Sequence, residues 1–269
     1  MNTKHLKPIL TKAFLTCFII IGVYCPAWAE CPTIQKIQPG FQKVFQGWEL
    51  SNIRPSEGAG ICELQVKFRG QNRILYVDAK GDYILAGSLM ELNTGKNVTM
   101  EATQALNRMT PDEMKQLESL TAFSAGKSEK ILYFVTDPQC PYCKKAEEIA
   151  KKMVDKGELT VRYLLYPLPM HKGAKEQCIA TICDKKGPEG LANGYKSENQ
   201  CPEGVKKVED SMAFLQAKGI GSTPTFIFAD GSFLPGMMPE DAFRKRLGLP
   251  PAQPQAGPEV KSAEKPVKK

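Results

Sequence analysis

A Cys-x-x-Cys motif between an apolar run and a helical pattern is the feature that most constrains this chain. The motif is Cys140-Pro141-Tyr142-Cys143, and it follows the apolar run 131–135. Beyond it, apolar residues recur with helical spacing, at Ala146, Ile149, Ala150, Met153 and Val154. The pattern therefore predicts a strand that ends just before a helix whose first turn holds both cysteines.

The expected position of the two sulfurs favours thiol–disulfide exchange. Free N–H groups and the positive end of the helix dipole stabilise a thiolate at a helix N-terminus, where Cys140 is expected. Cys143 comes one turn later, close enough to form a disulfide, and Pro141 suits the first turn because no N–H is needed there. The alternative, half of a zinc site, needs a second pair of ligands. The chain has no second Cys-x-x-Cys, and His171 is the only histidine beyond residue 5. We therefore expect redox chemistry without a metal or other cofactor.

The N-terminus has the pattern of a secretory signal peptide. Lys4, Lys7 and Lys12 precede the apolar stretch 13–23, and Ala27-Trp28-Ala29 fits a small-x-small cleavage site. We expect residues 1–29 to be removed. The alternative is an uncleaved anchor, but the apolar stretch is shorter than the roughly 20 residues of a membrane span.

Charge and cysteine content narrow the class further. The net charge is +7, and subtracting the three signal-peptide lysines leaves 7 − 3 = +4. Without a dense basic stripe, this balance does not favour nucleic-acid binding. Nine cysteines minus Cys17 and Cys25 of the signal leave seven. Export and this count indicate an oxidising compartment, and the odd number leaves at least one free or intermolecular thiol.

Residues 30–97 are expected to form a first unit of short antiparallel strands. Strand-like runs at 62–68, 73–77 and 83–87 are separated by turn signals. A meander of this size buries little apolar surface alone, so we expect it to pair with a second copy. Residues 98–125 have helical periodicity interrupted at Thr110-Pro111 and are expected to be a linker helix, possibly a broken one.

Residues 126–248 are expected to form the second unit. Strand 131–135, helix 141–156 and strand 160–166 make a β-α-β unit, followed by a cysteine-containing helical insertion. Two more strands, at 225–228 and 232–235, and a helix at 239–247 complete the order found in thioredoxin. The predicted fold class is an α+β N-terminal dimerisation domain, a linker helix, and an α/β thioredoxin-like catalytic domain. Residues 249–269 have almost no large apolar side chains and are expected to be a disordered tail.

A second element of the site is the segment Gly221-Ser222-Thr223-Pro224, directly before the strand at 225–228. Proline at that point removes a donor from the strand ladder. Only about 5–6% of X–Pro bonds in folded proteins are cis, so Thr-Pro alone would be an ordinary turn. In combination with Cys-x-x-Cys, we expect the cis-proline loop of a thioredoxin-like fold. Thr223 and Pro224, together with Tyr142, are the expected substrate-binding residues.

These motifs resemble the DsbC and DsbG family of periplasmic disulfide isomerases and reductases. The resemblance spans roughly residues 50–247. It rests on segments 134–137, 161–164, 221–224 and 234–236, on the pair Cys183 and Cys201, and on 75–77 and 84–87 in the first unit. It implies a V-shaped homodimer in the periplasm, with Cys140 as nucleophile and Cys143 as resolving thiol.

The resemblance also implies partners and disulfides. The clients would be unfolded or misoxidised exported proteins, and a membrane thiol reductase of the DsbD type would keep the site reduced. Cys183 and Cys201 would match the family's structural disulfide. Cys31 and Cys62 depart from the family pattern and are a possible second disulfide, which would leave Cys178 as the odd thiol.

Several functions stay open at this point. The Pro-Tyr dipeptide between the two cysteines is that of DsbG, whereas the rest of the chain is closer to DsbC. A reductase of sulfenylated single cysteines is therefore an alternative to an isomerase. A net dithiol oxidase is disfavoured by the first unit, and a non-catalytic chaperone module by the intact Cys-x-x-Cys and Thr-Pro. Asp137 either tunes proton transfer or is a solvated or capping carboxylate. His171 is not favoured as the base of a cysteine protease.

Overall fold

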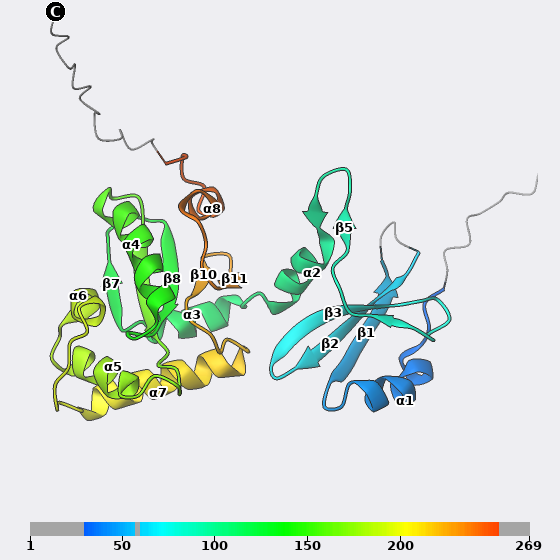
Figure 1. Ribbon diagram of the computed structural model, residues 1–269, viewed down its shortest axis with the longest axis horizontal. Coiled ribbons are helices and arrows are strands. Elements are labelled where there is room, and N and C mark those ends of the chain that lie inside the picture. Colours follow the sequence, from blue (N-terminus) through cyan, green and yellow to red (C-terminus); the bar gives the residue numbers. More distant parts are fainter. Residues whose placement is uncertain (1–29, 57–59, 253–269) are drawn as a thin grey trace, which may run out of the picture.

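The first unit is an antiparallel sheet covered on one face by a helix (Figure 1). The structure is a computed structural model, and it describes residues 30–56 and 60–252. Four strands pair in the order β1-β2-β3-β4, with bounds Glu49–Pro55, Cys62–Phe68, Gln71–Val77 and Ile84–Leu85. Helix α1 (Ile34–Val44) buries Ile37 and Phe41 against this sheet.

Helix α1 was not expected from the sequence. Pro39 and Gly40 lie inside it, and both residue types weaken a helical signal. The helix forms because Thr33 caps its first turn, accepting a hydrogen bond from the Lys36 N–H, and because Ile37 and Phe41 are buried one turn apart. Burial of these two side chains therefore outweighs the local propensity of the segment.

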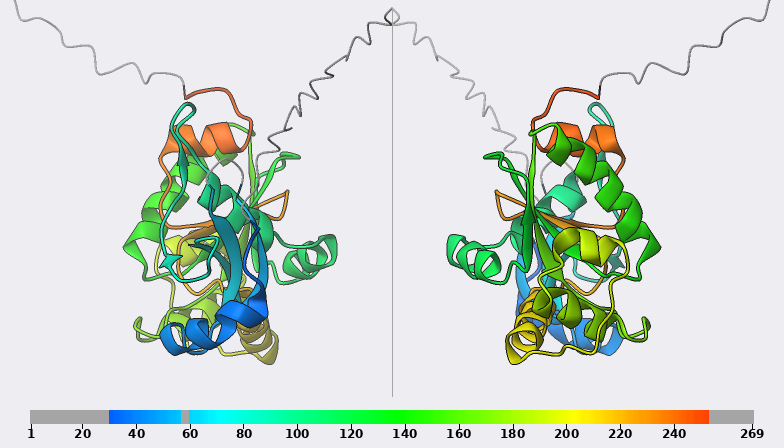
Figure 2. Two further views of the ribbon diagram at one scale, coloured as in Figure 1. Left: turned by 90° about the vertical axis from the view of Figure 1, so that its right-hand side faces the viewer. Right: turned by 90° about the vertical axis from the view of Figure 1, so that its left-hand side faces the viewer.

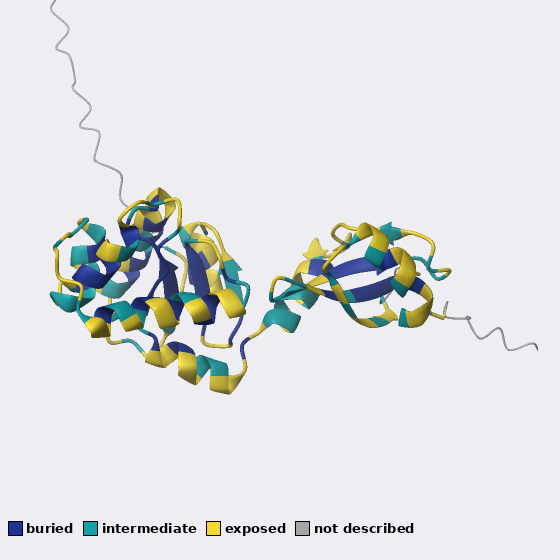
Figure 3. Ribbon diagram, turned by 90° about the horizontal axis from the view of Figure 1, so that it is seen from below, coloured by how far each residue is buried: buried dark blue, intermediate teal, exposed yellow. Residues whose placement is uncertain are grey.

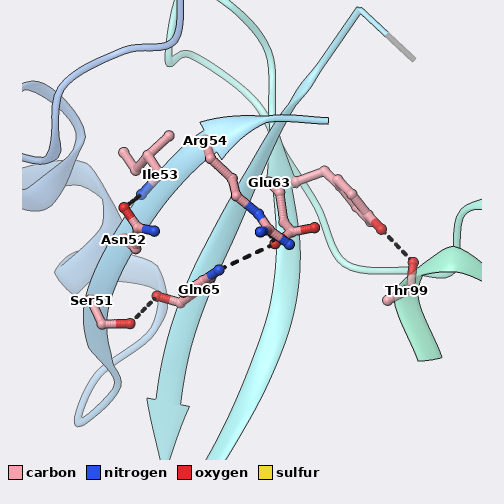
Figure 4. Close-up of polar contacts among 8 residues, drawn as sticks. Ser51, Asn52, Ile53, Arg54, Glu63, Gln65 and Thr99 are labelled. Atoms are coloured by element: carbon pink, nitrogen blue, oxygen red, sulfur yellow. Dashed lines mark hydrogen bonds and ion pairs between the residues drawn. The ribbon is translucent and has the colours of Figure 1, made fainter. Parts of the chain in front are cut away.

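Polar contacts tie the strands of the first unit together and join them to the next helix (Figure 4). Arg54 of β1 donates to the buried carboxylate of Glu63 in β2 at 2.8 Å. Tyr76 of β3 shares a buried hydrogen bond with Thr99, in the first turn of α2 (Val98–Asn107). Because a buried charge without a partner is costly, the Arg54–Glu63 pair specifies how β1 lies against β2.

The expected linker helix is divided into two helices. A hairpin of β5 (Met90–Glu91) and β6 (Lys96–Asn97) leads into α2, which ends at Asn107, and α3 begins at Pro111 and ends at Ser119. Thr110 caps α3 by accepting from the Glu113 N–H, and the Glu113 carboxylate accepts from the Thr110 N–H in return. The Thr-Pro signal therefore starts a new helix after a break.

The second unit has a mixed five-stranded sheet with helices on both faces (Figure 2). Its strand order is β11-β10-β8-β9-β7, with bounds Phe233–Pro235, Thr225–Phe228, Ile131–Thr136, Thr160–Leu165 and Phe123–Ala125. Only the central pair, β8 and β9, is parallel. Helices α4 (Pro141–Asp155) and α8 (Glu240–Arg246) pack on one face, and α3 and α7 (Pro202–Ala217) on the other. Figure 3 shows the buried strands between these layers. An α+β unit is thus followed along the chain by an α/β unit with the expected thioredoxin-like order of elements, as the predicted fold class requires.

The second unit extends beyond the bounds expected from the sequence. Leu117 and Leu120 of the α3 region are buried against its sheet, and β7 pairs with β9, so the unit begins well before residue 126. At its other end, Leu249 packs against the core and the carbonyl oxygen of Pro250 accepts from Arg244. The expected tail therefore starts after these residues. The rest of the expected tail, from residue 253, and the expected signal peptide lie outside the described residues.

The helical insertion carries one of the two disulfides found among the described residues. Helices α5 (Ala174–Cys183), α6 (Gly187–Ala192) and α7 follow β9, and Cys183 at the end of α5 is bonded to Cys201 at the start of α7. The second disulfide joins Cys31 to Cys62 in the first unit. Cys178 is free and fully buried in α5. Within the described residues, no helix is long and apolar enough to cross a membrane.

Replacing Cys183 and Cys201 together with serine should destabilise the second unit. The bond closes a loop with a sequence separation of 18, and chain-entropy estimates for loops of this size are roughly 3 kcal/mol. We expect the free energy of unfolding, measured by urea denaturation, to fall by about that amount, while part of the redox activity remains. A loss of less than about 0.5 kcal/mol in the free energy of unfolding would contradict a structural role, because ordinary surface substitutions cause changes of that size.

Candidate active site

Cys140 occupies the N-cap of helix α4, as the motif predicted for a strand-to-helix junction. Its sulfur accepts a hydrogen bond from the Cys143 N–H at 3.4 Å, and its own N–H donates to the Asp137 carbonyl oxygen. Pro141 is at the first helical position. The Cys140 sulfur therefore lies where the unpaired N–H groups and the helix dipole favour negative charge.

The cis-proline loop lies directly against this cysteine. The Thr223–Pro224 peptide bond is cis, and the Cys140 thiol donates to the Thr223 carbonyl oxygen at 3.6 Å. Sheet topology explains the proximity: β10 begins at Thr225, which pairs with Val135 near the end of β8. The segment after β8 and the segment before β10 therefore meet at one edge of the sheet.

Cys143 lies beneath Cys140 and is held in the thiol form. It is buried, and burial raises the pKa of its thiol to about 12. The backbone of Asp137 and the hydroxyl groups of Thr223 and Thr136 act in the opposite direction, because hydrogen bonds to a thiolate lower its pKa. The two cysteines are unbonded, so the structure represents the dithiol state.

A third segment is attached to the same edge through Asp137. The carboxylate of this residue has no exposed surface and accepts from the N–H groups of Gln139 at 2.7 Å and Leu168 at 2.6 Å. The imidazole Nδ1 of His171 lies 2.9 Å from the same carboxylate, and the Gln139 amide donates to the Lys172 carbonyl oxygen. Asp137 is therefore a buried carboxylate that joins the turn before Cys140 to the segment after β9, and it is not solvated.

Exposed apolar side chains surround this edge. Tyr142 is 59% exposed beside the motif, Met170 is 75% exposed on the loop held by Asp137, and Met237 is 38% exposed just after β11. Gly236, its neighbour, donates its N–H to the Pro224 carbonyl oxygen. A flexible methionine accommodates side chains of different shapes, so the rim suits apolar segments of varied sequence.

Glu147 lies one turn after Cys143 in helix α4. It is partly buried beside Tyr163 of β9, and burial raises the pKa of its carboxyl group to about 6. Burial and the adjacent carboxylate both raise the pKa of Tyr163. These residues line a hollow between α4 and α6 that also contains Lys144 and Glu189.

Sequence reasoning missed the contact between Asp137 and His171. The residues are 34 positions apart by their numbers, 171 − 137, and neither belongs to a regular element. The usable signal was that both follow parallel strands, because the carboxyl ends of β8 and β9 meet at one edge of the sheet. Cys178, expected as the odd thiol, is buried close to Asp137, and burial raises its pKa well above the ordinary value.

Two family models match separate parts of the chain. The model described as "Disulfide bond isomerase protein N-terminal domain" matches residues 28–100, and the one described as "Thioredoxin-like domain" matches residues 118–249. Together the two models indicate that the chain resembles the DsbC and DsbG family in both of its units. It is accordingly a thiol–disulfide oxidoreductase, whose chemistry is thiol:disulfide interchange.

Individual relatives agree with this assignment at low identity. The probable thiol:disulfide interchange protein DsbC of Bordetella parapertussis is 24% identical, over 82% of this chain and 76% of its own length. DsbC of Escherichia coli is 23% identical over 75% of this chain and 82% of its own length. DsbG of Pseudomonas aeruginosa is 22% identical over 63% of this chain and 70% of its own length. Among solved structures, the catalytic domain of Proteus mirabilis ScsC matches with a TM-score of 0.44 and 16% identity, covering 52% of this chain and 97% of that domain.

Alkylation of the native dithiol should label Cys140 before Cys143. Both cysteines are buried, Cys140 at 4% exposure and Cys143 at 2%, but burial raises the pKa of Cys143 to about 12, whereas the Cys140 sulfur lies at the helix N-terminus, where negative charge is favoured. Iodoacetamide labelling followed by peptide mass spectrometry should show this order. The buried Cys178 is an internal control, because it should react only after denaturation. Faster labelling of Cys143 would contradict the geometry.

Glu147→Gln should stabilise the protein at neutral pH but not in acid. The folded-state pKa of Glu147 is raised, so the carboxyl group favours folding below the unfolded value of about 4.5 and loses that contribution as pH rises through about 6. Gln keeps a polar partner for Tyr163 without an ionisation cost. Allowing for partial exposure, the variant should gain about 1 kcal/mol over wild type at pH 7.5 and nothing at pH 4.

Urea denaturation at both pH values measures this difference. Glu148→Gln, on the exposed face of the same helix, is the matched control. An equal change in both variants, or a gain for Glu147→Gln that is the same at pH 4 and pH 7.5, would exclude burial of Glu147 as the cause.

Proposed function

We propose that this protein is a homodimeric periplasmic isomerase that corrects wrong disulfides in exported proteins and also reduces disulfides. The observation that carries the proposal is the contact of the Cys140 sulfur, at the N-cap of α4, with the Thr223 carbonyl oxygen of the cis-proline loop. A client sulfur bonded to Cys140 would thus lie beside the backbone of that loop.

The proposed reaction starts with attack of the Cys140 thiolate on a client disulfide. The client S–S bond breaks, a bond forms between Cys140 and one client sulfur, and the other client sulfur leaves as a thiolate. Thr223 and Pro224 would hold the client backbone, and Tyr142 would contact its side chains. The free N–H groups at the helix N-terminus stabilise negative charge on the Cys140 sulfur, which also helps it to leave.

The mixed disulfide can then be resolved in two ways. In isomerisation, a second client thiolate attacks the client sulfur bonded to Cys140, which leaves as a thiolate, and no electrons are gained or lost overall. In reduction, the Cys143 thiolate attacks Cys140, releases the reduced client, and leaves a Cys140–Cys143 disulfide. A donor such as a membrane thiol reductase must then supply two electrons.

The burial of Cys143 favours isomerisation. Its pKa is raised to about 12, so only a small fraction of Cys143 is thiolate at neutral pH. Attack by Cys143 on the mixed disulfide is slowed by that fraction. A client thiolate therefore has more time to attack first. This argument supports isomerisation over net reduction, and reduction of sulfenylated single cysteines remains the second candidate because of the Pro-Tyr dipeptide between the cysteines.

An open sheet edge in the first unit supports the dimer. Strand β4 is the outermost strand of its sheet within the described residues, and it pairs only with β3 there. Leu85 in this strand is 58% exposed, and Tyr83 just before it is 78% exposed. Pairing of β4 with a second copy across a twofold axis would satisfy the edge and bury both side chains.

Leu85→Lys tests the dimer and the isomerase together. A charge on β4 should oppose edge pairing, so light scattering should give a monomer for the variant and a dimer for wild type. Refolding of scrambled ribonuclease should fall strongly in the monomer, because one client would no longer face two sites. Insulin reduction, which needs a single site, should fall less. Cys140→Ser should abolish both activities.

Val44→Lys is the matched control, because Val44 is also apolar and 73% exposed in the first unit but lies at the end of α1. It should remain dimeric and active. A monomeric wild type, or a monomeric variant with full isomerase activity, would overturn the proposal. The redox state of Cys140 and Cys143 in the periplasm is a further test: two reduced thiols would exclude a net oxidase.

A further inference from the structure

The two units touch at a place separate from the chain connection between them. The turn between β2 and β3 in the first unit approaches the end of α7 in the second (Figure 1). A Cβ added at Gly70 in this turn would lie 2.9 Å from the carbonyl oxygen of Ala217. A Cβ added at Gly219 would lie 2.0 Å from Cγ of Gln71. Both glycines have positive φ, +81° and +70°, so the contact depends on glycine for conformation and for space.

Gln71 thereby becomes part of the surroundings of the cis-proline loop. It lines one wall of a cavity of about 300 Å³, whose other walls are segment 219–222, Thr225 and the β11 residues Phe233 and Pro235. Segment 219–222 leads directly into Thr223 and Pro224. The first unit therefore contacts the segment that carries the loop against which Cys140 lies.

The segment that connects the two units is hydrogen-bonded to each of them, which restricts their relative movement at this contact. Asn107 at the end of α2 accepts from the Asn72 N–H at 2.8 Å and donates to the Asn72 carbonyl oxygen at 2.8 Å, at the start of β3. Two residues later, the Met109 N–H donates to the Gly231 carbonyl oxygen of the second unit at 2.9 Å. Arg108 between them lies 3.4 Å from the Asp230 carboxylate.

We propose that Gln71 and Gly219 are positioning residues for disulfide interchange with protein clients. The β2–β3 turn of the first unit holds segment 219–222, and so holds Thr223 and Pro224 in the conformation that a client backbone meets. Ordering this segment before binding removes an entropic cost that a client would otherwise bear. The inference rests on the proposed client-binding role of the cis-proline loop, and it adds that the first unit contributes to that site within one chain.

A double-mutant cycle in the full-length protein tests the contact. The variants are Gly219→Ala, Gln71→Ala and the double variant. Each reduced protein is reacted with insulin, a protein client, and with oxidised glutathione, a disulfide too small to span the loop. The measured quantity is the ratio of the two second-order rate constants, because a change in thiol reactivity alone cancels in that ratio.

Gly219→Ala places a methyl group against Gln71, so it should displace the turn and lower the insulin-to-glutathione ratio by roughly three- to tenfold, which lies in the lower part of the range of couplings between residues in contact. Gln71→Ala removes the Cγ atom that the methyl group meets. The double variant should therefore recover most of the ratio lost in Gly219→Ala. The strain of alanine at positive φ is present in both backgrounds and cancels in the cycle.

Gly157→Ala is the matched control for strain. Gly157 is in the same unit and has φ +72°, but a Cβ there would have no neighbour within 4 Å. It should lower the melting temperature through the strain of alanine at positive φ alone, and leave the ratio as in wild type. A lowered ratio in Gly157→Ala, or equal effects of Gly219→Ala in both Gln71 backgrounds, would overturn the proposal.

Pro224→Ala separates this inference from the proposed function. If Pro224→Ala leaves the ratio at the wild-type value, clients do not use the cis-proline loop, and both proposals are lost. If Pro224→Ala lowers the ratio while the cycle is additive, the loop binds clients without help from the first unit, and only the present inference is lost.

Discussion

The site depends on one constraint, the pairing of β8 with β9 on one side and with β10 on the other. The parallel pair aligns the ends of β8 and β9, and antiparallel pairing of β8 with β10 brings the start of β10 to the same edge. Three chain segments far apart in the sequence therefore converge there: the Cys140 motif, the loop that contains His171, and the cis-proline loop. Without this register, the sulfur of Cys140 would not face the Thr223 carbonyl oxygen.

The buried Asp137 carboxylate secures two of these segments. It satisfies N–H groups of Gln139 and Leu168, and it lies beside the imidazole of His171. A carboxylate without exposed surface requires such partners, because burying an unpaired charge is strongly unfavourable. Asp137 thus fixes the turn that places Cys140 at the N-cap, and at the same time holds the loop that displays Met170. Asp137 therefore contributes to redox chemistry by positioning the segment that carries Cys140.

The strong local signals of the sequence predicted the centre of the second unit well. The run at 131–135, the helical spacing after Cys143 and the strand at 160–166 correspond to β8, α4 and β9 within a residue or two. These elements are buried and periodic, so tertiary packing and local preference agree. Cys140 was predicted as a site residue from this strand-to-helix junction, whereas Pro224 was predicted from its place before a strand only in combination with the Cys-x-x-Cys motif.

Other parts of the chain followed longer-range packing and were not predictable locally. Helix α1 forms around Pro39 because Ile37 and Phe41 have a sheet to cover. Strand β7 is only Phe123–Ala125, too short for a periodic signal, and it exists because β9 offers an edge. The break at Arg108 was suggested by Thr110-Pro111, but the assignment of α3 to the second unit follows from burial of Leu117 against that sheet.

The short connection between the units has a consequence for how such a protein handles large clients. Asn107 is bonded to β3 and Met109 to the β10–β11 turn, so a single residue separates one unit from the other. A connection this short limits independent rotation of the catalytic unit, in contrast to a flexible linker whose span grows with its length. In a dimer formed through β4, the two Cys140 sulfurs would then keep a defined separation and direction. Client size would be accommodated mainly by the exposed apolar rim of Tyr142, Met170 and Met237, whose side chains can adapt without a change in the angle between the units.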